Sequence, residues 1–267
     1  MKKIGFIGCG NMGGALVSAA AKVISGEDIY LCDTFAEKAK ELAKKYGANV
    51  AELENVARNC DYIFLGVKPQ GFESLFAAIS SVLKSRKDNF VLISMAAGVS
   101  ISAVEKMADC NCSVIRIMPN TPVSVGEGMI LYSPNNSVSE EQLNFFENLL
   151  SMAGKLDMLP EDKIDAASAL SGCGPAFVYM FAEALSDGAV ECGLPRDKAM
   201  LYAAQTLLGA AKLLEESGKH PGVLKDAVCS PGGTTIAGVH ALEDGAFRAS
   251  AINAVKKAYE RTLELKK

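Results

Sequence analysis

The chain has 267 residues, of which 49% are hydrophobic, so it can bury the core of one large domain or of two ordinary ones. Its formal net charge is −4 and its basic residues do not cluster, which argues against binding to nucleic acid or to an anionic membrane. No apolar run approaches the roughly 18 residues of a membrane span, and the apolar stretch after Met1-Lys2-Lys3 is too short for a signal peptide. We therefore expect a cytoplasmic protein.

The cysteines are scattered through apolar segments and form no C-x-x-C pair, which is typical of buried thiols in a reducing compartment. The two histidines, His220 and His240, do not have the spacing of metal ligands, so we expect no metal site. The cysteines are Cys9, Cys32, Cys60, Cys110, Cys112, Cys173, Cys192 and Cys229.

The first fourteen residues contain a nucleotide-binding motif. An apolar run over 4–7 predicts a buried parallel strand, and it breaks into Gly8-x-Gly10-x-x-Gly13 just before a helical pattern over 11–25. In such a turn the first glycine permits a tight bend, the second lets the backbone approach a pyrophosphate, and the third lets the helix pack on the strand. The positive end of the helix then faces the phosphates, so the turn predicts a dinucleotide site. The predicted contacts here are Gly8, Gly10, Asn11, Met12 and Gly13.

A second strand is predicted over 28–32 and ends at Asp33. In a dinucleotide fold an acid about 20 residues after the glycines binds the adenosine ribose hydroxyls, which favours NAD over NADP. The nearest cations, Lys38 and Lys40, lie further into a helix predicted over 36–46. The alternative is that Asp33 only caps that helix.

Three further strands are predicted over 61–67, 90–94 and 113–118. Because ligands contact the carboxyl ends of parallel strands, the corner Val67-Lys68-Pro69-Gln70 should lie along the cofactor. Lys68 either approaches a phosphate or stays solvated.

The other two strands end in residues that suit the nicotinamide half of a cofactor. Met95-Ala96-Ala97-Gly98 would let a ring and a ribose lie against the backbone. Pro119-Asn120-Thr121-Pro122 would hold two hydrogen-bonding side chains in a fixed backbone, although a plain turn is the alternative.

Segments over 126–131, 139–152 and 155–158 complete an alternation of strands and helices, which predicts a doubly wound α/β domain with a parallel main sheet. Strand signals stop beyond Leu159. The sequence therefore predicts a dinucleotide-binding domain over 1–159 and an all-helical domain over 160–267. The predicted helices of the second domain cover 160–170, 175–192, 195–217, 221–228, 235–242 and 246–266.

The helices predicted over 175–192 and 195–217 carry apolar residues on more than one face. A small helical domain cannot bury that much apolar surface alone, so we expect a homodimer. Packing of these helices against the first domain is the alternative.

A second candidate site is Cys229-Ser230-Pro231-Gly232-Gly233-Thr234-Thr235, which separates two predicted helices. Adjacent glycines and a helix start point several backbone N–H groups toward one place, beside the hydroxyls of Ser230, Thr234 and Thr235, and this arrangement suits a carboxylate. The alternative is an ordinary helix connection with a threonine cap.

A dinucleotide site together with a carboxylate cradle indicates hydride transfer to or from a small acid. Reduction of a ketone calls for a proton donor, and neither histidine nor the lysine-free segment 168–175 offers one. A protonated imine is already electrophilic, so hydroxyls and positioning suffice. An imine is therefore the favoured substrate.

Six blocks make the chain resemble the pyrroline-5-carboxylate reductases along nearly its whole length. The glycine turn is shared with many dehydrogenases, whereas the last two blocks are specific. The blocks are Ile7-Gly8-Cys9-Gly10-Asn11-Met12-Gly13, Gly66-Val67-Lys68-Pro69-Gln70, Ala96-Ala97-Gly98-Val99, Arg116-Ile117-Met118-Pro119-Asn120-Thr121-Pro122, Ser171-Gly172-Cys173-Gly174-Pro175-Ala176-Phe177, and Leu224-Lys225-Asp226-Ala227-Val228 with Ser230-Pro231-Gly232-Gly233-Thr234-Thr235.

The resemblance implies reduction of 1-pyrroline-5-carboxylate to L-proline with NAD(P)H, the last step of proline synthesis. It also implies a Rossmann domain followed by an interlocked helical dimerisation domain, with dimers often assembled into rings of five. The substrate residues that it implies are Val228, Ser230, Gly233, Thr234 and Thr235, with Thr235 as the catalytic hydrogen-bond partner of the ring nitrogen. The further cofactor residues that it implies are Val67, Lys68, Pro69, Ala97 and Asn120.

The sequence departs from the family after the second strand. The family generally prefers NADPH and often has Ser, Thr or Arg there, whereas this chain has Cys32-Asp33-Thr34-Phe35. The family habit therefore favours NADPH and Asp33 favours NADH, which leaves the cofactor open.

Two alternatives have different functions. A β-hydroxyacid dehydrogenase would share the two-domain plan, but it would want a catalytic lysine after the domain boundary, where Lys163 is the only candidate before Ser171. A non-enzymatic dinucleotide-sensing dimer would need the turn over 230–235 to be a mere connection.

Overall fold

A computed structural model describes residues 2–265, which form two compact units. Unit 1 holds residues 2–172 together with 259–265, and unit 2 holds residues 173–258. Each unit has its own architecture, and the two are described in turn.

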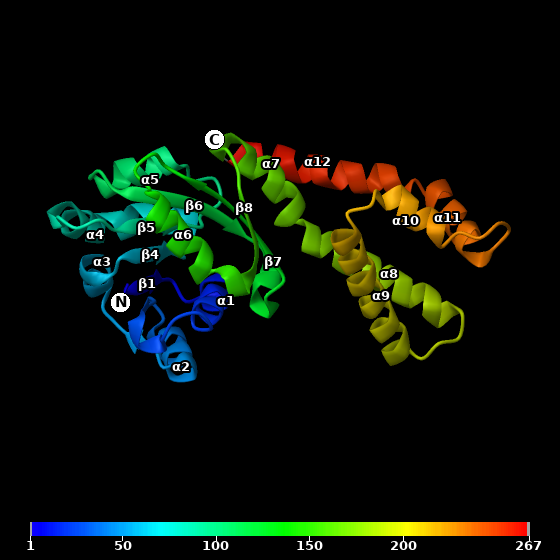
Figure 1. Ribbon diagram of the computed structural model, residues 1–267, viewed down its shortest axis with the longest axis horizontal. Coiled ribbons are helices and arrows are strands. Elements are labelled where there is room, and N and C mark those ends of the chain that lie inside the picture. Colours follow the sequence, from blue (N-terminus) through cyan, green and yellow to red (C-terminus); the bar gives the residue numbers. More distant parts are fainter. Residues whose placement is uncertain (1, 266–267) are drawn as a thin grey trace. The chain divides into compact units, whose positions relative to one another are not determined.

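Among the described residues, eight strands of unit 1 form one sheet in the order β3-β2-β1-β4-β5-β6-β7-β8 (Figure 1). The chain runs from β1 outward to β3 and then returns to the other side of β1, so the order reverses between β1 and β4. In doubly wound sheets such a switch point is where ligands bind. The strands are β1 (Ile4–Ile7), β2 (Ile29–Cys32), β3 (Asn49–Val50), β4 (Tyr62–Leu65), β5 (Val91–Ser94), β6 (Ser113–Pro119), β7 (Gly128–Pro134) and β8 (Gly154–Met158).

All neighbouring strands are parallel except β6 and β7, which are antiparallel. Only a short 3-10 helix over Thr121–Val125 connects β6 to β7. Parallel neighbours need a long crossover, so this short connection imposes the antiparallel pair within an otherwise parallel sheet. The doubly wound α/β class predicted for the amino-terminal half is confirmed.

Helices cover both faces of the sheet (Figure 1). One apolar cluster lies under α1, α2 and α6, where the rings of Phe6 and Phe64 stack with their centroids 4.4 Å apart. A second cluster, around Ile63 and Phe76, lies under α3, α4 and α5. The central strands are buried on both faces, which explains their continuous apolar sequences. These helices are α1 (Asn11–Ala20), α2 (Ala36–Tyr46), α3 (Leu53–Asn59), α4 (Phe72–Ser85), α5 (Ile101–Ala108) and α6 (Glu140–Leu149).

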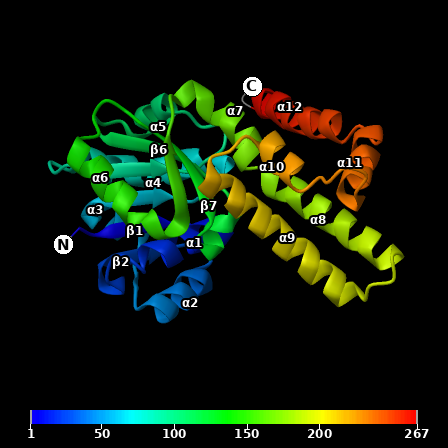
Figure 2. The same cartoon turned by 45° about the vertical axis from the view of Figure 1, so that its right-hand side comes forward.

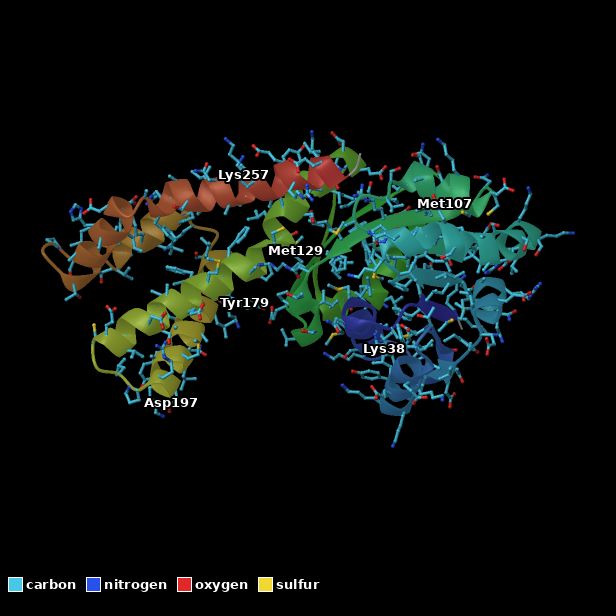
Figure 3. All side chains as sticks on the ribbon, turned by 180° about the vertical axis from the view of Figure 1, so that it is seen from behind. Lys38, Met107, Met129, Tyr179, Asp197 and Lys257 are labelled. Carbon is cyan, nitrogen blue, oxygen red and sulfur yellow. The ribbon has the colours of Figure 1, made fainter. Side chains whose placement is uncertain are left out.

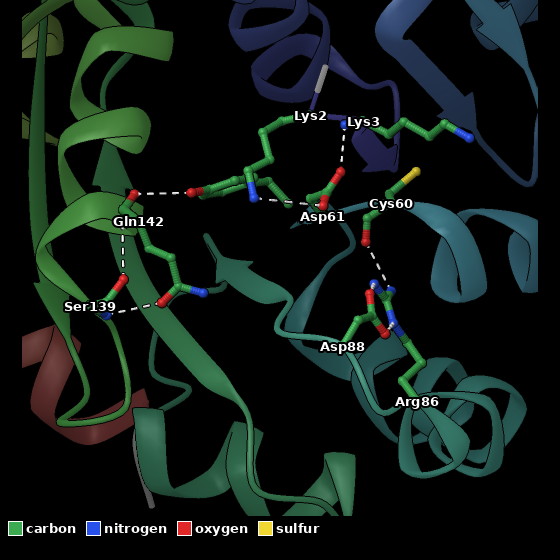
Figure 4. Close-up of polar contacts among 9 residues, drawn as sticks. Lys2, Lys3, Cys60, Asp61, Arg86, Asp88, Ser139 and Gln142 are labelled. Carbon is green, nitrogen blue, oxygen red and sulfur yellow. Dashed lines mark hydrogen bonds and ion pairs between the residues drawn. The ribbon is translucent and has the colours of Figure 1, made fainter.

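The amino-terminal edge of the sheet is closed by polar contacts (Figure 4). Asp61 accepts the backbone N–H of Lys3 at 2.7 Å, and Arg86 donates to the carbonyl oxygen of Cys60 at 2.8 Å. Ser139 and Gln142 form a capping box at the start of α6. This edge is therefore held together by its own side chains.

Helix α7 (Glu161–Ser171) also belongs to unit 1. Arg116 of β6, which is 2% exposed, donates to Asp165 at 2.8 Å and to Glu161 at 3.3 Å. Glu161 also accepts the N–H of Ile101 at 2.8 Å. The last strand ends at Met158, close to the predicted domain boundary at 159. Helix α7 nevertheless packs with the sheet in unit 1, because this ion-pair network holds it there.

Unit 2 is entirely helical, and α8 and α9 form its antiparallel helical hairpin (Figure 2). Within the described part of α8 to α12, only Ser186, Ala199 and Ala203 are buried. Large apolar side chains such as Tyr179 and Leu208 are exposed. The helices are α8 (Gly174–Glu191), α9 (Arg196–Ser217), α10 (Pro221–Ala227), α11 (Thr234–Asp244) and α12 (Phe247–Leu265), whose last residues belong to unit 1.

Over the described range 2–265, no helix has both the length and the apolar character required to cross a bilayer.

Candidate active site

A groove with a cavity volume of about 650 Å³ lies at the carboxyl edge of the sheet in unit 1. It opens where β1, β2 and β4 end, which is the switch point of the strand order. The groove is lined by Ile7, Gly8, Gly10, Cys32, Asp33, Thr34, Phe35, Lys38, Glu52, Leu53, Gly66, Val67, Lys68, Gly71, Ser74 and Leu75.

Two of the three glycines of the turn meet a steric requirement, and the third does not. Gly8 has a φ of +102°, and a Cβ there would meet the carbonyl group of Gly66 at 2.6 Å. A Cβ on Gly13 would meet the carbonyl oxygen of Gly8 at 2.1 Å, so only glycine lets α1 pack this closely on β1. A Cβ on Gly10 would meet nothing within 4 Å, so this glycine leaves open space beside the groove.

Helix α1 begins directly after this turn without a side-chain cap. Its N-cap residue is Gly10, and no side chain accepts the first N–H groups of the helix. Uncapped N–H groups and the positive end of the helix dipole suit a phosphate. The turn and the groove therefore fit a dinucleotide.

Asp33 connects the end of β2 to the glycine turn. Its carboxylate accepts the N–H of Cys9 at 2.6 Å and the N–H of Phe35 at 2.8 Å. The N-cap residue of α2 is Phe35, so the alternative in which Asp33 caps that helix is wrong. The carboxylate lies in the wall of the groove instead.

Two cysteines of this region have raised pKa values. Burial, followed by the charge of Asp33, raises the pKa of Cys9 to about 12. Burial also raises the pKa of Cys32, and the charges of Glu52 and Asp33 add to that effect. Because the thiolate is the reactive form, both side chains remain neutral thiols near pH 7.

The structure gathers five of the predicted cofactor residues in the groove lining. The five are Gly8, Gly10, Asp33, Val67 and Lys68. Asn11, Met12 and Gly13 form the first turn of α1 and Pro69 starts a short 3-10 helix, all outside that lining. Ala97 is exposed after the end of β5, also outside the lining.

Asn120 has an additional structural role. Its side-chain amide donates to the carbonyl oxygen of Ser171 at 2.9 Å and accepts the N–H of Met129 at 2.9 Å. It thereby ties the end of β6 to β7 and to the end of α7. The cofactor contact predicted for Asn120 stays a prediction.

Several residues of the groove lining are not among the cofactor contacts that the sequence predicts. Thr34, Phe35 and Lys38 follow β2, so their proximity to its carboxyl end was an available signal. Glu52 and Leu53 follow β3, which has two exposed residues and no apolar pattern. No local signal identified that strand.

The predicted carboxylate cradle is a turn of unit 2 between α10 and α11. Gly232 has a φ of +70°, and the N–H of Gly233 donates to the carbonyl oxygen of Ser230 at 3.0 Å. Gly233 is the N-cap residue of α11 and no side chain caps this helix, so the alternative of a connection with a threonine cap is wrong. The start of α11 is thus open to an anion, with the exposed Thr235 in its first turn.

Within residues 2–265, no three His, Cys, Asp or Glu side chains gather in a way that would hold a metal ion. Lys163, the lysine that a β-hydroxyacid dehydrogenase would need, is exposed and pairs with Asp162 at 3.0 Å.

Known proteins resemble this chain over its full length. The family model described as pyrroline-5-carboxylate reductase dimerisation matches residues 161–265, and the one described as NADP oxidoreductase coenzyme F420-dependent matches residues 3–98. The pyrroline-5-carboxylate reductase of Escherichia coli (strain K12) is 41% identical over 270 residues, covering 100% of this chain and 99% of that protein.

Solved structures agree with this assignment. A pyrroline-5-carboxylate reductase from Coxiella burnetii has a TM-score of 0.92 at 33% identity and covers 100% of this chain and 99% of its own. A Plasmodium falciparum pyrroline carboxylate reductase with NADP bound has a TM-score of 0.87 at 33% identity. The match covers 100% of this chain and 98% of that protein. The dehydrogenase and sensor alternatives are therefore set aside, and the chain belongs to the pyrroline-5-carboxylate reductase family.

Proposed function

We propose that this protein reduces the C=N bond of 1-pyrroline-5-carboxylate to give L-proline, with a nicotinamide dinucleotide held along the groove of unit 1. The observation that carries the proposal is the presence, in one chain of this family, of two uncapped glycine turns at the starts of α1 and α11. One suits a pyrophosphate and the other a carboxylate.

The turn of unit 2 holds the substrate in this proposal. The N–H groups at the start of α11 bind the carboxylate, and the hydroxyl of Thr235 makes a hydrogen bond to the ring nitrogen. The protonated imine is electrophilic, so these residues act by binding and orienting it rather than by donating a proton. The substrate residues are Val228, Ser230, Gly233, Thr234 and Thr235.

The groove of unit 1 holds the cofactor, which supplies the hydride when bound. The glycine turn and the start of α1 hold the pyrophosphate. Val67 and Lys68 contact the cofactor from the groove lining, and Pro69, Ala97 and Asn120 contact it beyond that lining. Asp33 accepts hydrogen bonds from the adenosine ribose hydroxyls. Each of its carboxylate oxygens already accepts one backbone N–H and can accept a further hydrogen bond. On this basis the protein uses NADH in preference to NADPH, although a relative of known structure binds NADP.

Unit 2 forms a homodimer through the apolar side chains that α8 to α12 leave exposed. Five such dimers assemble into a ring, and the enzyme works in the cytoplasm. Light scattering of the purified protein tests the first two statements, because a species of 28.1 kDa would contradict the dimer.

Turnover of synthetic 1-pyrroline-5-carboxylate, followed by NADH and NADPH absorbance, tests the reaction. We expect Thr235→Ala to lower kcat/KM on the order of tenfold to a hundredfold, because a hydrogen bond to a charged group is lost. The affinity for the nucleotide should stay unchanged. Thr206→Ala, at an exposed threonine of α9, is the matched control. Loss of nucleotide affinity in Thr235→Ala would place the substrate elsewhere.

A further inference from the structure

Two acidic residues, Asp33 and Glu52, follow the neighbouring strands β2 and β3 at the carboxyl edge of the sheet. The parallel register pairs Leu31 with Val50, and the N–H of Ala51 donates to the carbonyl oxygen of Leu31 at 3.0 Å. Two residues beyond that pair, Asp33 and Glu52 therefore leave neighbouring strands side by side. Both line the groove.

The side chain of Glu52 has no structural partner among the described residues. It stands at the N-cap of α3 without capping the helix, it is exposed, and it forms no hydrogen bond or ion pair there. Asp33, in contrast, accepts two backbone N–H groups. The carboxylate of Glu52 does not cap α3. It contributes a negative charge to the groove instead. That charge already acts on the wall, because burial raises the pKa of Cys32 and the charges of Glu52 and Asp33 raise it further.

The cations of the groove do not balance this pair. Lys38, which is labelled in Figure 3, belongs to α2 and has its Nζ 5.1 Å from the centroid of the Phe35 ring. Lys68 follows β4, which β1 separates from β2. At the β2 and β3 end, the groove lining thus contains two carboxylates and one ammonium group.

We propose that Glu52 is a specificity-determining residue that, together with Asp33, excludes a 2′-phosphate from the adenosine end of the groove. A phosphate monoester carries a charge of about −1.5 to −2 near pH 7 and is repelled by both carboxylates. A ribose 2′-hydroxyl is neutral and donates a hydrogen bond to a carboxylate. This inference rests on the proposed nucleotide site, and it gives that site a second acidic determinant.

Glu52 allows a cleaner test than Asp33. Replacing Asp33 removes a charge and also two hydrogen bonds, one of which, from the N–H of Cys9, holds the glycine turn, so any change of affinity has two causes. Glu52→Gln removes only a charge, at constant size. Glu54→Gln is the matched control, because Glu54 is an exposed acid of the same helix that pairs with Arg58 and does not line the groove.

The test is calorimetric binding of adenosine 2′,5′-bisphosphate and of 5′-AMP, two ligands that differ only by the 2′-phosphate. We expect Glu52→Gln to tighten the bisphosphate about three- to tenfold and to leave 5′-AMP unchanged. Glu52→Lys should give a larger gain, and high salt should shrink both gains. Glu54→Gln should change neither ligand.

The ratio of kcat/KM for NADPH to that for NADH should rise by the same factor in Glu52→Gln. An unchanged bisphosphate affinity in both Glu52 variants, an equal gain in Glu54→Gln, or failure of the parent protein to bind either fragment would overturn the inference. If the fragments behave as expected but 1-pyrroline-5-carboxylate is not reduced, the proposed function fails and the inference stands.

Discussion

Unit 1 and unit 2 bury their apolar side chains to very different extents. Unit 1 encloses a sheet between two helical layers, and rings such as Phe6 and Phe64 are fully covered by their own chain. In the described part of α8 to α12 the buried residues are only Ser186, Ala199 and Ala203, while Tyr179 and Leu208 stay exposed. Buried apolar area is the main favourable term in folding, so unit 1 supplies its own stability and unit 2 requires a further surface.

The largest effect is expected where the sheet of unit 1 holds α7. Arg116→Met removes a buried guanidinium from Asp165, which is 3% exposed, and from Glu161. Taking one partner from a buried ion pair costs about 3–5 kcal/mol of unfolding free energy. Urea denaturation at fixed protein concentration measures this loss.

Arg58→Met is the control for that measurement. Arg58 pairs with Glu54 on the surface of α3, where such a pair contributes about 0.3–0.5 kcal/mol. Equal losses in the two variants would mean that burial of Arg116 does not set its contribution.

A smaller effect is expected on the exposed face of unit 2. Leu208 of α9 is 57% exposed in one protomer, so Leu208→Glu should leave protomer folding intact. It should raise the dimer dissociation constant at least about tenfold, because a charge would enter an apolar interface. Sedimentation equilibrium reports that constant.

Met158→Glu makes the same change at an equally exposed apolar residue of unit 1, which is 55% exposed. We expect this variant to remain dimeric. Equal dissociation of both variants would remove the distinction between the two units as the source of the dimer.

The third effect concerns the glycine turn of unit 1. Gly13→Ala would place a Cβ 2.1 Å from the carbonyl oxygen of Gly8, so the turn must move and nucleotide affinity should fall on the order of tenfold. At Gly14 the new Cβ would meet Leu42 at 3.5 Å, an ordinary contact. Gly14→Ala should therefore keep its affinity, as measured by quenching of NADH fluorescence or by calorimetry.

The difference between buried and exposed segments also explains how much of the fold the sequence predicts. The runs over 4–7 and 90–94 correspond to β1 and β5 within a residue, because strands buried on both faces have continuous apolar sequences. The run over 28–32 also corresponds to β2 within a residue, although Tyr30 and Cys32 are only half-buried. The two residues of β3 are exposed, so no pattern predicts that strand. The helix predicted over 11–25 ends as α1 at Ala20, since turn residues follow it.

The candidate site follows the same rule. The glycine turn is predictable because two of its requirements are local: Gly8 has a φ of +102°, and a Cβ on Gly13 would meet the carbonyl oxygen of Gly8. The role of Glu52 is not, because its position depends on a register with β2 that only the folded sheet creates. The hydrogen bond from Asn120 to Ser171 likewise joins residues 51 positions apart. Contacts between distant segments carry no signal in a single sequence.

The smallest effect is expected from an ion pair at the amino-terminal edge of unit 1 (Figure 4), where Arg86 is almost fully covered and Asp88 is exposed. The guanidinium of Arg86 lowers the pKa of Asp88 through a hydrogen bond, so the folded state favours the carboxylate. Stability from this pair is present above the unfolded pKa of about 3.9 and is lost as the pH falls through the lower folded value.

Asp88→Asn should therefore lower the unfolding free energy by about 0.2–1 kcal/mol at pH 7, a range set by solvent screening of an exposed partner. Below the folded pKa of Asp88, parent and variant should become equally stable. Asp187→Asn in unit 2 removes a carboxylate from a pair with Arg196 in which both side chains are exposed, so its effect at pH 7 should be smaller still. A greater loss in unit 2 than in unit 1 would show that the cover over Arg86 does not strengthen its ion pair.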